Sequence, residues 1–210
     1  WRDRKGLSWI DPTAKDAWDY NLAIAKEAAK RGFDEINFDY IRFPSDGNLR
    51  DIVFPFWDEQ IPKAEVMNNF FDYLSDELAG VGVPISADIF GLTTWNTDDL
   101  NIGQVLEDIA KRFDYVSPMV YPSHYHSGFL GYRNPAEYPY EVIKYSLEKA
   151  LMRLANDKEQ ITNSSSTATS SDQFAISHLP YAAKLRPWLQ DFDLGADYDA
   201  VMVRKEIQSV

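Results

Sequence analysis

The sequence predicts an α/β fold of the (β/α)8 TIM-barrel type, with about four of the eight βα units present in its 210 residues. Segments with apolar residues at helical spacing alternate with short strand-like runs, which is typical of a parallel sheet with helical crossovers. In three of these runs one face is aliphatic and the other is polar or small. We therefore expect a single, partial barrel domain over residues 1–210.

The expected helices have recognisable boundary residues. The first runs from Thr13 to Arg31, because Asp11 and Pro12 are typical of a helix start and Gly32 of a helix end. The same apolar periodicity predicts helices over 63–79, 98–112 and 139–156, and a last one from about 197.

Strands are expected between these helices, over about 35–43, 84–91, 115–122 and 184–192. Successive strand side chains point to opposite faces of a sheet. The aliphatic or aromatic sets are Ile36, Phe38 and Tyr40; Ile85, Ala87 and Ile89; and Val116, Pro118 and Val120. The opposite sets are Glu35, Asn37, Asp39 and Ile41; Ser86, Asp88 and Phe90; and Tyr115, Ser117, Met119 and Tyr121. An open sheet covered by helices would be apolar on both faces, so the alternation favours a barrel.

The fourth strand is expected to point Leu185 and Leu189 outward. Arg186, Trp188 and Gln190 would then face inward, with Asp191 near the rim. Four strands would leave two open sheet edges, so we expect a longer protein or a partner to complete the barrel. The segment 161–173 is rich in Ser and Thr and is expected to form a flexible surface insertion.

Composition argues against several partners. The 33 acidic and 21 basic residues give a net charge of −12, which disfavours binding to nucleic acid or anionic lipid. No apolar run approaches the roughly 18 residues of a membrane span. Cysteine is absent, which excludes disulfides and thiolate metal sites, and we predict no metal and no cofactor.

Two carboxylates of the first strand differ in position. Glu35 and Asp39 share a face but lie roughly 13 Å apart along a strand, too far for a glycosidase pair at ~5 to 9.5 Å. Glu35 is at the start of the strand, where we expect a solvated or salt-bridged residue. Asp39 and Asp88 occupy similar places near the ends of neighbouring strands, where one of two close carboxyls is expected to hold a proton. Alternatively, Arg42 or Arg186 neutralises them in a structural network.

Aromatic and polar residues gather at the same expected rim: Trp95, Tyr121, His124, Tyr125, His126, Trp188 and Asp191. Aromatic rings beside carboxylates suit a sugar, which stacks its C–H face on a ring and directs its hydroxyls to charged acceptors. His124 and His126 lack a clear third metal ligand.

Five blocks carry a resemblance: GFDEINFDYIRFPSDG (32–47), SADIFGL (86–92), DYVSPMVYPSHY (114–125), NPAEYPYEVI (134–143) and LRPWLQDF (185–192). In these blocks the chain resembles a largely uncharacterised bacterial family of glycoside-hydrolase domains with a TIM-barrel fold. The resemblance implies a carbohydrate substrate, an extracellular or cell-envelope location, and a chain that corresponds to the middle and later strands of the barrel. It points to Asp39 and Asp88 as acidic site residues, and to Tyr121, His124, Trp188, Gln190 and Asp191 as substrate contacts.

The first hypothesis is therefore a glycoside hydrolase acting on a polysaccharide. Asp39 would be nucleophile or charge stabiliser and Asp88 the acid/base, with Arg42 orienting Asp39 and Trp95 among the rings that hold sugar. The alternative is a non-catalytic carbohydrate-binding or cell-envelope scaffold with the same fold. A third hypothesis is a metal-assisted hydrolase that uses Asp39, Asp88 and His124.

Overall fold

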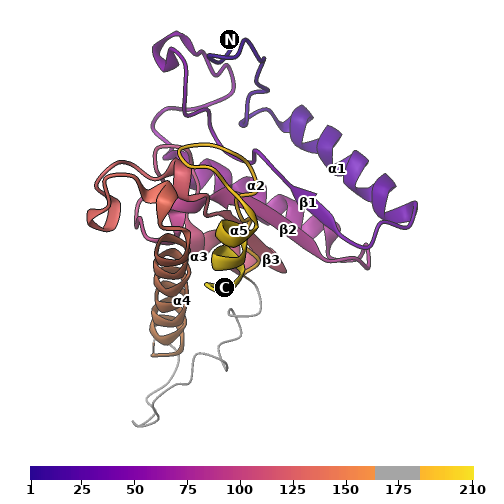
Figure 1. The fold of residues 1–210 in the computed structure, drawn as a ribbon. Coiled ribbons are helices and arrows are strands. Elements are labelled where there is room, and N and C mark those ends of the chain that lie inside the picture. The colour runs from indigo at the N-terminus through magenta and orange to yellow at the C-terminus, as the bar shows by residue number, and fades with distance from the viewer. Residues whose placement is uncertain (164–184) are drawn as a thin grey trace. The chain divides into compact units, whose positions relative to one another are not determined.

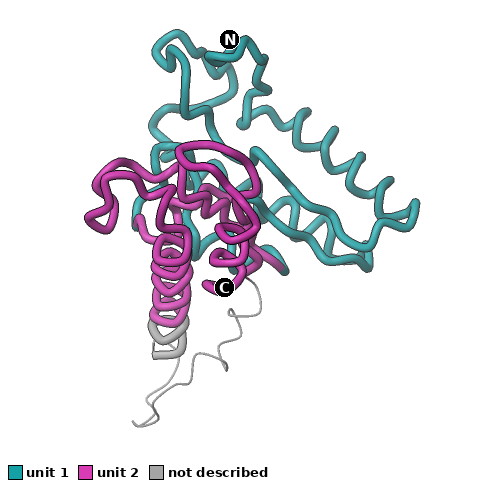
Figure 2. The backbone as a smooth tube through the Cα atoms, in the orientation of Figure 1, with its two compact units in different colours: residues 1–88, 97–114 teal, residues 89–96, 115–210 magenta. Residues whose placement is uncertain are grey.

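The computed structural model describes residues 1–163 and 185–210 and shows a mixed α/β protein with parallel strands. It divides into two compact units (Figure 2). Unit 1 comprises residues 1–88 and 97–114, and unit 2 comprises residues 89–96 and 115–210. Each unit is described by itself.

Unit 1 alternates helices and strands in the expected order (Figure 1). Its elements are α1 (Lys15–Lys30), β1 (Ile36–Phe38), α2 (Lys63–Leu78), β2 (Ile85–Phe90, of which the last two residues belong to unit 2), α3 (Leu106–Arg112) and a short 3-10 helix (Leu49–Asp51). The first two helices and the second strand are thus confirmed to within two residues at either end. β1 pairs in parallel with β2 through Ile36 and Ile85, Asn37 and Ser86, and Phe38 and Ala87.

The core of unit 1 is built on aromatic rings and on the apolar side of α2. Phe113 lies 6.2 Å from Phe38 and 5.7 Å from Phe71, measured between ring centroids. The buried residues of α2 recur at helical spacing: Val66, Met67, Phe70, Phe71, Leu74 and Leu78. α1 buries Leu22 and Ala25 and contacts both β1 and α2. Burial of these side chains supplies the main driving force for unit 1 to fold.

The expected strand 35–43 was wrong beyond Phe38. Tyr40 has a left-handed backbone, with φ of 54°, which ends the extended conformation. The alternation of faces changes there as well. Tyr40, expected beside Ile36 and Phe38, is exposed, whereas Ile41, expected on the polar face, is buried.

The expected helix 98–112 was also too long, because it begins only at Leu106. Leu100, Asn101 and Gly103 all have positive φ, which a right-handed helix cannot accommodate. Gly103 also lies against α2, since a Cβ at this position would overlap the side chain of Met67 and lie 2.9 Å from the Lys63 carbonyl oxygen.

Unit 2 contains one described strand and two described α-helices. These are β3 (Tyr115–Met119), α4 (Pro139–Asn163) and α5 (Ala200–Ile207). Short 3-10 helices lie at Gly91–Thr94, Pro122–His124, Phe129–Gly131 and Pro135–Glu137. The expected third strand ends early, at Met119, because Pro122 already begins a 3-10 helix.

The prediction of a continuous fourth strand over 184–192 was wrong for residues 185–192, the described part of that range. Two isolated parallel bridges pair Leu185 with Val116 and Trp188 with Met119. Pro187 and Pro118 provide no N–H donors, so the ladder is sparse.

The ends of the helices in unit 2 differ from expectation. α4 continues to Asn163 instead of ending near 156, so residues 161–163 of the expected insertion are helical. The remainder of that insertion, 164–173, lies outside the described residues. α5 begins at Ala200, where the Asp199 carboxylate caps the helix by accepting the N–H groups of Val201 and Met202.

Two apolar clusters form the described core of unit 2. One joins Val120, Ile143 and Leu147, with Leu189 packed against them. The other joins Tyr125, Phe129 and Val142, with Leu92, Trp95 and Tyr145 packed around them. No helix in the described ranges 1–163 and 185–210 is long and apolar enough to cross a bilayer.

Candidate functional site

Two acidic residues follow the last paired residues of the neighbouring strands β1 and β2. Phe38 pairs with Ala87, so the next residues in this parallel register are Asp39 and Asp88. Backbones of neighbouring strands are separated by about 4.8 Å. Asp88 is still within β2, whereas Asp39 is the first residue after β1. The expectation that these two strands are neighbours is confirmed.

Asp88 is held in place from two sides. Its side chain accepts a hydrogen bond of 3.1 Å from the amide of Asn37, and the residue is only 7% exposed. Its backbone carbonyl accepts a 3.3 Å bond from the buried amide of Gln104, which also reaches the Ile41 carbonyl at 3.4 Å. Gln104 therefore joins the end of β2 to the segment that follows β1.

Asn37 and Gln104 were both missed as site residues. The alternation of faces did place Asn37 on the side of Asp39, and this signal was available from the sequence. Gln104 gave no such signal, because it lies in the stretch expected to be helix and reaches the site through irregular backbone.

Asp39 is exposed, in contrast to Asp88. One of its carboxylate oxygens, Oδ1, accepts the backbone N–H of Tyr40 at 2.7 Å. The carboxylate is thereby oriented by the turn that ends β1 and remains accessible to a ligand.

Arg42 is buried next to this turn. Its Nη1 donates to the Phe43 carbonyl at 3.0 Å and to Ser45 Oγ at 3.2 Å. The guanidinium carbon lies 4.9 Å from the Trp9 ring centroid and 5.1 Å from that of Tyr40. Burial lowers the pKa of Arg42, and the charges of Tyr40, Asp46 and Asp39 oppose that shift. Arg42 thus places a buried positive charge near Asp39 within unit 1.

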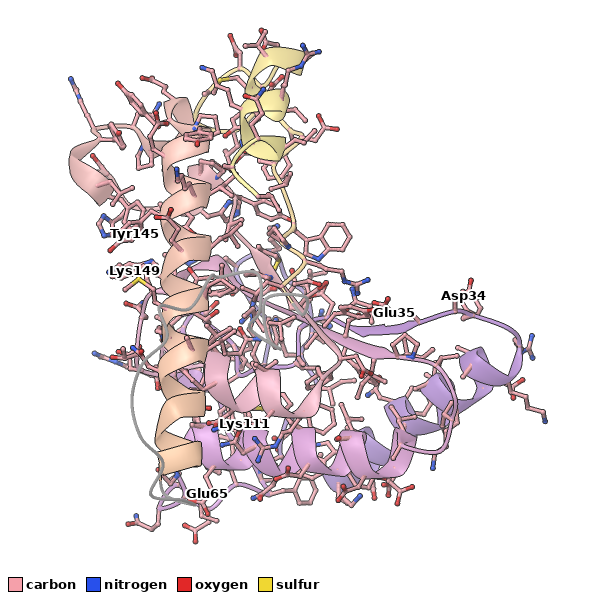
Figure 3. All side chains as sticks on the ribbon, turned by 90° about the horizontal axis from the view of Figure 1, so that it is seen from below. Asp34, Glu35, Glu65, Lys111, Tyr145 and Lys149 are labelled. Atoms are coloured by element: carbon pink, nitrogen blue, oxygen red, sulfur yellow. The ribbon has the colours of Figure 1, made fainter. Side chains whose placement is uncertain are left out.

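Glu35 lies at the opposite end of β1, next to Asp34 (Figure 3). Its Oε1 accepts a 2.5 Å hydrogen bond from the hydroxyl of Ser86. Ser86 is fully buried, so Glu35 satisfies a polar group that would otherwise lack this acceptor. This is a structural contact between the two strands.

In unit 2, Tyr121 and His124 lie together with Phe192, which was not singled out from the sequence. The ring centroid of Tyr121 lies 5.3 Å from the ring centroid of His124 and 5.3 Å from that of Phe192. Partial burial lowers the pKa of His124. A weakly basic imidazole beside two aromatic rings is a surface suited to stacking and hydrogen bonding.

Gln190 is fully buried and joins three segments of unit 2. Its Oε1 accepts the Ser123 N–H at 3.2 Å, and its Nε2 donates to the carbonyls of Phe192 and Leu194 at 3.0 and 3.2 Å. Its backbone N–H donates to Glu206 at 2.7 Å. The amide is thus engaged in internal bonds that hold the segment carrying His124 against the segment carrying Phe192.

Glu206, on α5, is a buried carboxyl that sequence reasoning missed. Burial raises its pKa to about 7, although the hydrogen bond from Gln190 acts in the opposite direction. The charge of the neighbouring Asp191, which is itself exposed, raises this pKa further.

The two predicted tryptophans differ in environment. Trp188 is 47% exposed, while its backbone pairs with Met119. Trp95 packs on Phe129, with 5.5 Å between ring centroids, and its buried indole N–H has no hydrogen-bond partner among the described residues. Arg153 of α4 holds the Trp95 segment by donating to the carbonyls of Thr93 and Asn96.

The remaining predicted positions have local partners in unit 2. Arg186 lies 3.7 Å above the Tyr115 ring, measured to its centroid. Tyr125 bonds to Ser146 at 2.8 Å, and burial raises its pKa to about 12. In the part of the chain that the structure describes, no three His, Cys, Asp or Glu residues are grouped so as to hold a metal ion.

Comparison with known proteins gives one family match. The sequence profile of a family described as "Putative glycosyl hydrolase domain" matches residues 1–210. A comparison with curated proteins gives no match.

Two solved structures show partial similarity to this chain. The spore cortex-lytic enzyme SleL of Bacillus megaterium QM B1551 is 18% identical, with a TM-score of 0.44 over 68% of this chain and 28% of that chain. The glycoside hydrolase domain of PgaB (BpsB) from Bordetella bronchiseptica is 15% identical, with a TM-score of 0.44 over 71% of this chain and 46% of that chain. The present chain thus spans less than half of either structure.

Proposed function

Because the chain belongs to the family described as "Putative glycosyl hydrolase domain", we propose that it cleaves glycosidic bonds of a polysaccharide through Asp39 and Asp88. One observation carries the choice of these residues. The parallel register of β1 and β2 places both at the carboxyl ends of neighbouring strands. In barrels built from βα units, catalytic groups lie at that end.

The strand spacing is compatible with a glycosidase pair. Neighbouring backbones at about 4.8 Å leave room for the side chains to adopt the ~5 to 9.5 Å carboxyl separations of retaining and inverting enzymes. The two acids also differ in environment, since Asp88 is buried and held by Asn37 whereas Asp39 is exposed. Such a difference allows two carboxyls to take different roles.

In the proposed reaction, Asp88 gives its proton to the glycosidic oxygen as the bond from that oxygen to the anomeric carbon breaks. Asp39 either attacks that carbon or stabilises the positive charge that develops on the sugar. In the first case water hydrolyses the resulting ester, and in the second water adds directly to the cationic anomeric carbon. In both cases Asp88 accepts the proton of that water. Arg42 helps to orient the Asp39 carboxylate through its charge.

Within unit 2, considered by itself, we propose a set of sugar-contact residues. Tyr121, His124 and Trp188 offer rings, and Asp191 offers an exposed carboxylate for sugar hydroxyls. Trp95, which is half-buried against Phe129, is a further proposed ring contact, and Gln190 holds the segments that carry His124 and Asp191.

We also propose that these elements are about four βα units of a TIM barrel. The parallel pairing of β1 with β2, and of β3 with residues 185 and 188, supports this fold. Closure needs further strands, from chain outside residues 1–210 or from a partner. A polysaccharide substrate favours action at the cell envelope or outside the cell.

The test is a screen of the full-length protein on bacterial exopolysaccharides, with release of reducing ends as the readout. Asp39→Asn should lower kcat by at least about a hundredfold, because it removes the charge that acts on the anomeric carbon. Asp34→Asn is the matched control, since Asp34 is an exposed acid five residues earlier on the same segment.

Unchanged turnover in the Asp39→Asn protein would remove Asp39 from catalysis. Binding of a polysaccharide without any hydrolysis by the unaltered protein would favour a carbohydrate-binding scaffold instead.

A further inference from the structure

Tyr40 has a backbone conformation that is energetically unfavourable for a tyrosine. Its φ of 54° is left-handed, a region in which bulky residues are rare outside strained or functional turns. The turn is held on both sides, because Tyr40 donates its N–H to the Asp39 carboxylate and its carbonyl accepts the Arg42 N–H at 2.9 Å. The left-handed conformation is thus built into the chain immediately after Asp39.

This conformation determines the direction of the Tyr40 side chain. A regular strand would place residue 40 on the face of Ile36 and Phe38, both of which are buried. Instead Tyr40 is 64% exposed. Burial of the ring therefore does little to offset the strained backbone.

The ring nevertheless has a defined support. The Arg42 guanidinium lies 5.1 Å from its centroid, and the Trp9 ring meets it at 5.6 Å with an interplanar angle of 71°. Arg42 is itself buried and fixed by hydrogen bonds to Phe43 and Ser45. An exposed ring that is supported from beneath is ready to stack with a ligand at little cost in entropy.

We propose that Tyr40 is a substrate-contact residue whose ring stacks on the C–H face of a pyranose unit bound beside Asp39. The inference rests on the proposed function and names one contact of that site. Stacking requires a sugar with an apolar ring face, so the substrate class is a chain of pyranoses with equatorial hydroxyls or acetamido groups, such as β-linked glucose or N-acetylglucosamine. Arg42 and Trp9 act as positioning residues for the ring.

The test measures binding of cellohexaose and chitohexaose to the full-length protein by calorimetry, in an Asp39→Asn background so that the ligand is not consumed. Tyr40→Asn should weaken binding roughly three- to tenfold, the size expected for one aromatic stack. Tyr40→Phe keeps the ring and should bind within about twofold of its parent. Tyr20→Ala is the matched control, since Tyr20 is 65% exposed on the regular helix α1.

Thermal unfolding separates a contact role from a structural one. Asn tolerates the left-handed conformation better than Tyr, so Tyr40→Asn should unfold at an unchanged midpoint or one higher by roughly 2 to 4 °C. A lower midpoint together with unaltered affinity would show that Tyr40 is structural and would overturn the inference. Equal weakening by Tyr20→Ala, or the absence of binding to both oligosaccharides, would overturn it as well.

The same variants and oligosaccharides distinguish a failure of the Tyr40 contact from a failure of the proposed hydrolysis. If the protein with Asp39 intact binds the oligosaccharides without cleaving them, the proposed function fails while the Tyr40 effect on binding remains. If cleavage occurs and KM is the same in the Tyr40→Asn and unaltered proteins, the Tyr40 contact fails and the proposed function stands.

Discussion

The side-chain amide of Asn37 donates a hydrogen bond of 3.1 Å to the Asp88 carboxylate, across the neighbouring strands β1 and β2. Asn37 pairs in register with Ser86, so its amide reaches forward along β2, toward the carboxyl end of the strands. The bond links the orientation of Asp88 to the strand that leads into Asp39. In the proposed mechanism, this fixes the acid/base relative to its partner.

Asn37→Ala should therefore lower kcat by about ten- to a hundredfold with little change in KM, because a small displacement of a catalytic group is costly. Steady-state kinetics on the substrate identified by the screen give both values. Asn68→Ala is the control, since Asn68 makes a similar 2.9 Å bond to Asp108 between α2 and α3. A loss of activity of the same size in the control would mean that the effect is general destabilisation.

Glu35 should matter for stability and not for catalysis. Glu35→Ala removes the acceptor for the hydroxyl of buried Ser86 and should cost about 1 to 3 kcal/mol in the free energy of unfolding. Urea unfolding measures that cost, and Glu35→Gln, which still offers an acceptor, should recover most of it. Turnover that drops at least a hundredfold in folded Glu35→Gln protein would contradict the structural role.

Glu206 should make the protein less stable as the pH rises from about 4.5 to 7. Its pKa is raised by burial from 4.5 to about 7, so the folded protein holds a proton in this range that the unfolded chain has released. The stabilisation is complete below pH 4.5 and is lost as pH rises through the folded pKa. In Glu206→Gln protein this slope should be flatter across the same window. Parallel stability curves for the two proteins would contradict the assignment.

Gly91 should be intolerant of any side chain. A Cβ there would overlap the Met119 carbonyl oxygen and lie 2.9 Å from its carbon, so Gly91→Ala should destabilise by roughly 1 to 3 kcal/mol. Gly80→Ala is the control, because no atom lies within 4 Å of the corresponding Cβ and its effect should stay within about 0.5 kcal/mol. Equal unfolding midpoints for the two variants would mean that the close approach at Gly91 relaxes easily.

Where apolar residues follow a clear pattern, the predicted element agreed closely with the structure. α2 was readable because six buried residues recur at helical spacing, and β2 because an apolar run is bounded by Pro84 and Gly91. The neighbouring placement of Asp39 and Asp88 followed from these elements.

Local backbone geometry could not be predicted from the hydrophobic pattern. Nothing in the alternation of residues 36–43 signals a left-handed Tyr40, since a Tyr normally continues a strand. Leu100 and Asn101 likewise end what the apolar spacing indicated as helix. The contacts made by Gln104 depend on this irregular backbone, so they were not predictable from periodicity.

The hydrogen-bond partners of buried polar side chains were also not predictable from the sequence. Gln190 was expected to face inward as a substrate contact, whereas its amide bonds to Ser123, Phe192 and Leu194. Such hydrogen bonds join segments far apart in sequence, and the residue types alone do not specify them.

The central claim is that Asp88 protonates the leaving group, and the rate of Asp88→Asn on two kinds of substrate tests it most directly. On the polysaccharide identified by the screen, this variant should be slower by about 10² to 10⁴ in kcat, whereas Asp34→Asn keeps its activity. On the matching aryl glycoside, whose dinitrophenolate leaving group needs no proton, the loss should be far smaller. Equal losses on both substrates, or retention of full activity on the polysaccharide, would contradict the role of Asp88 as the acid.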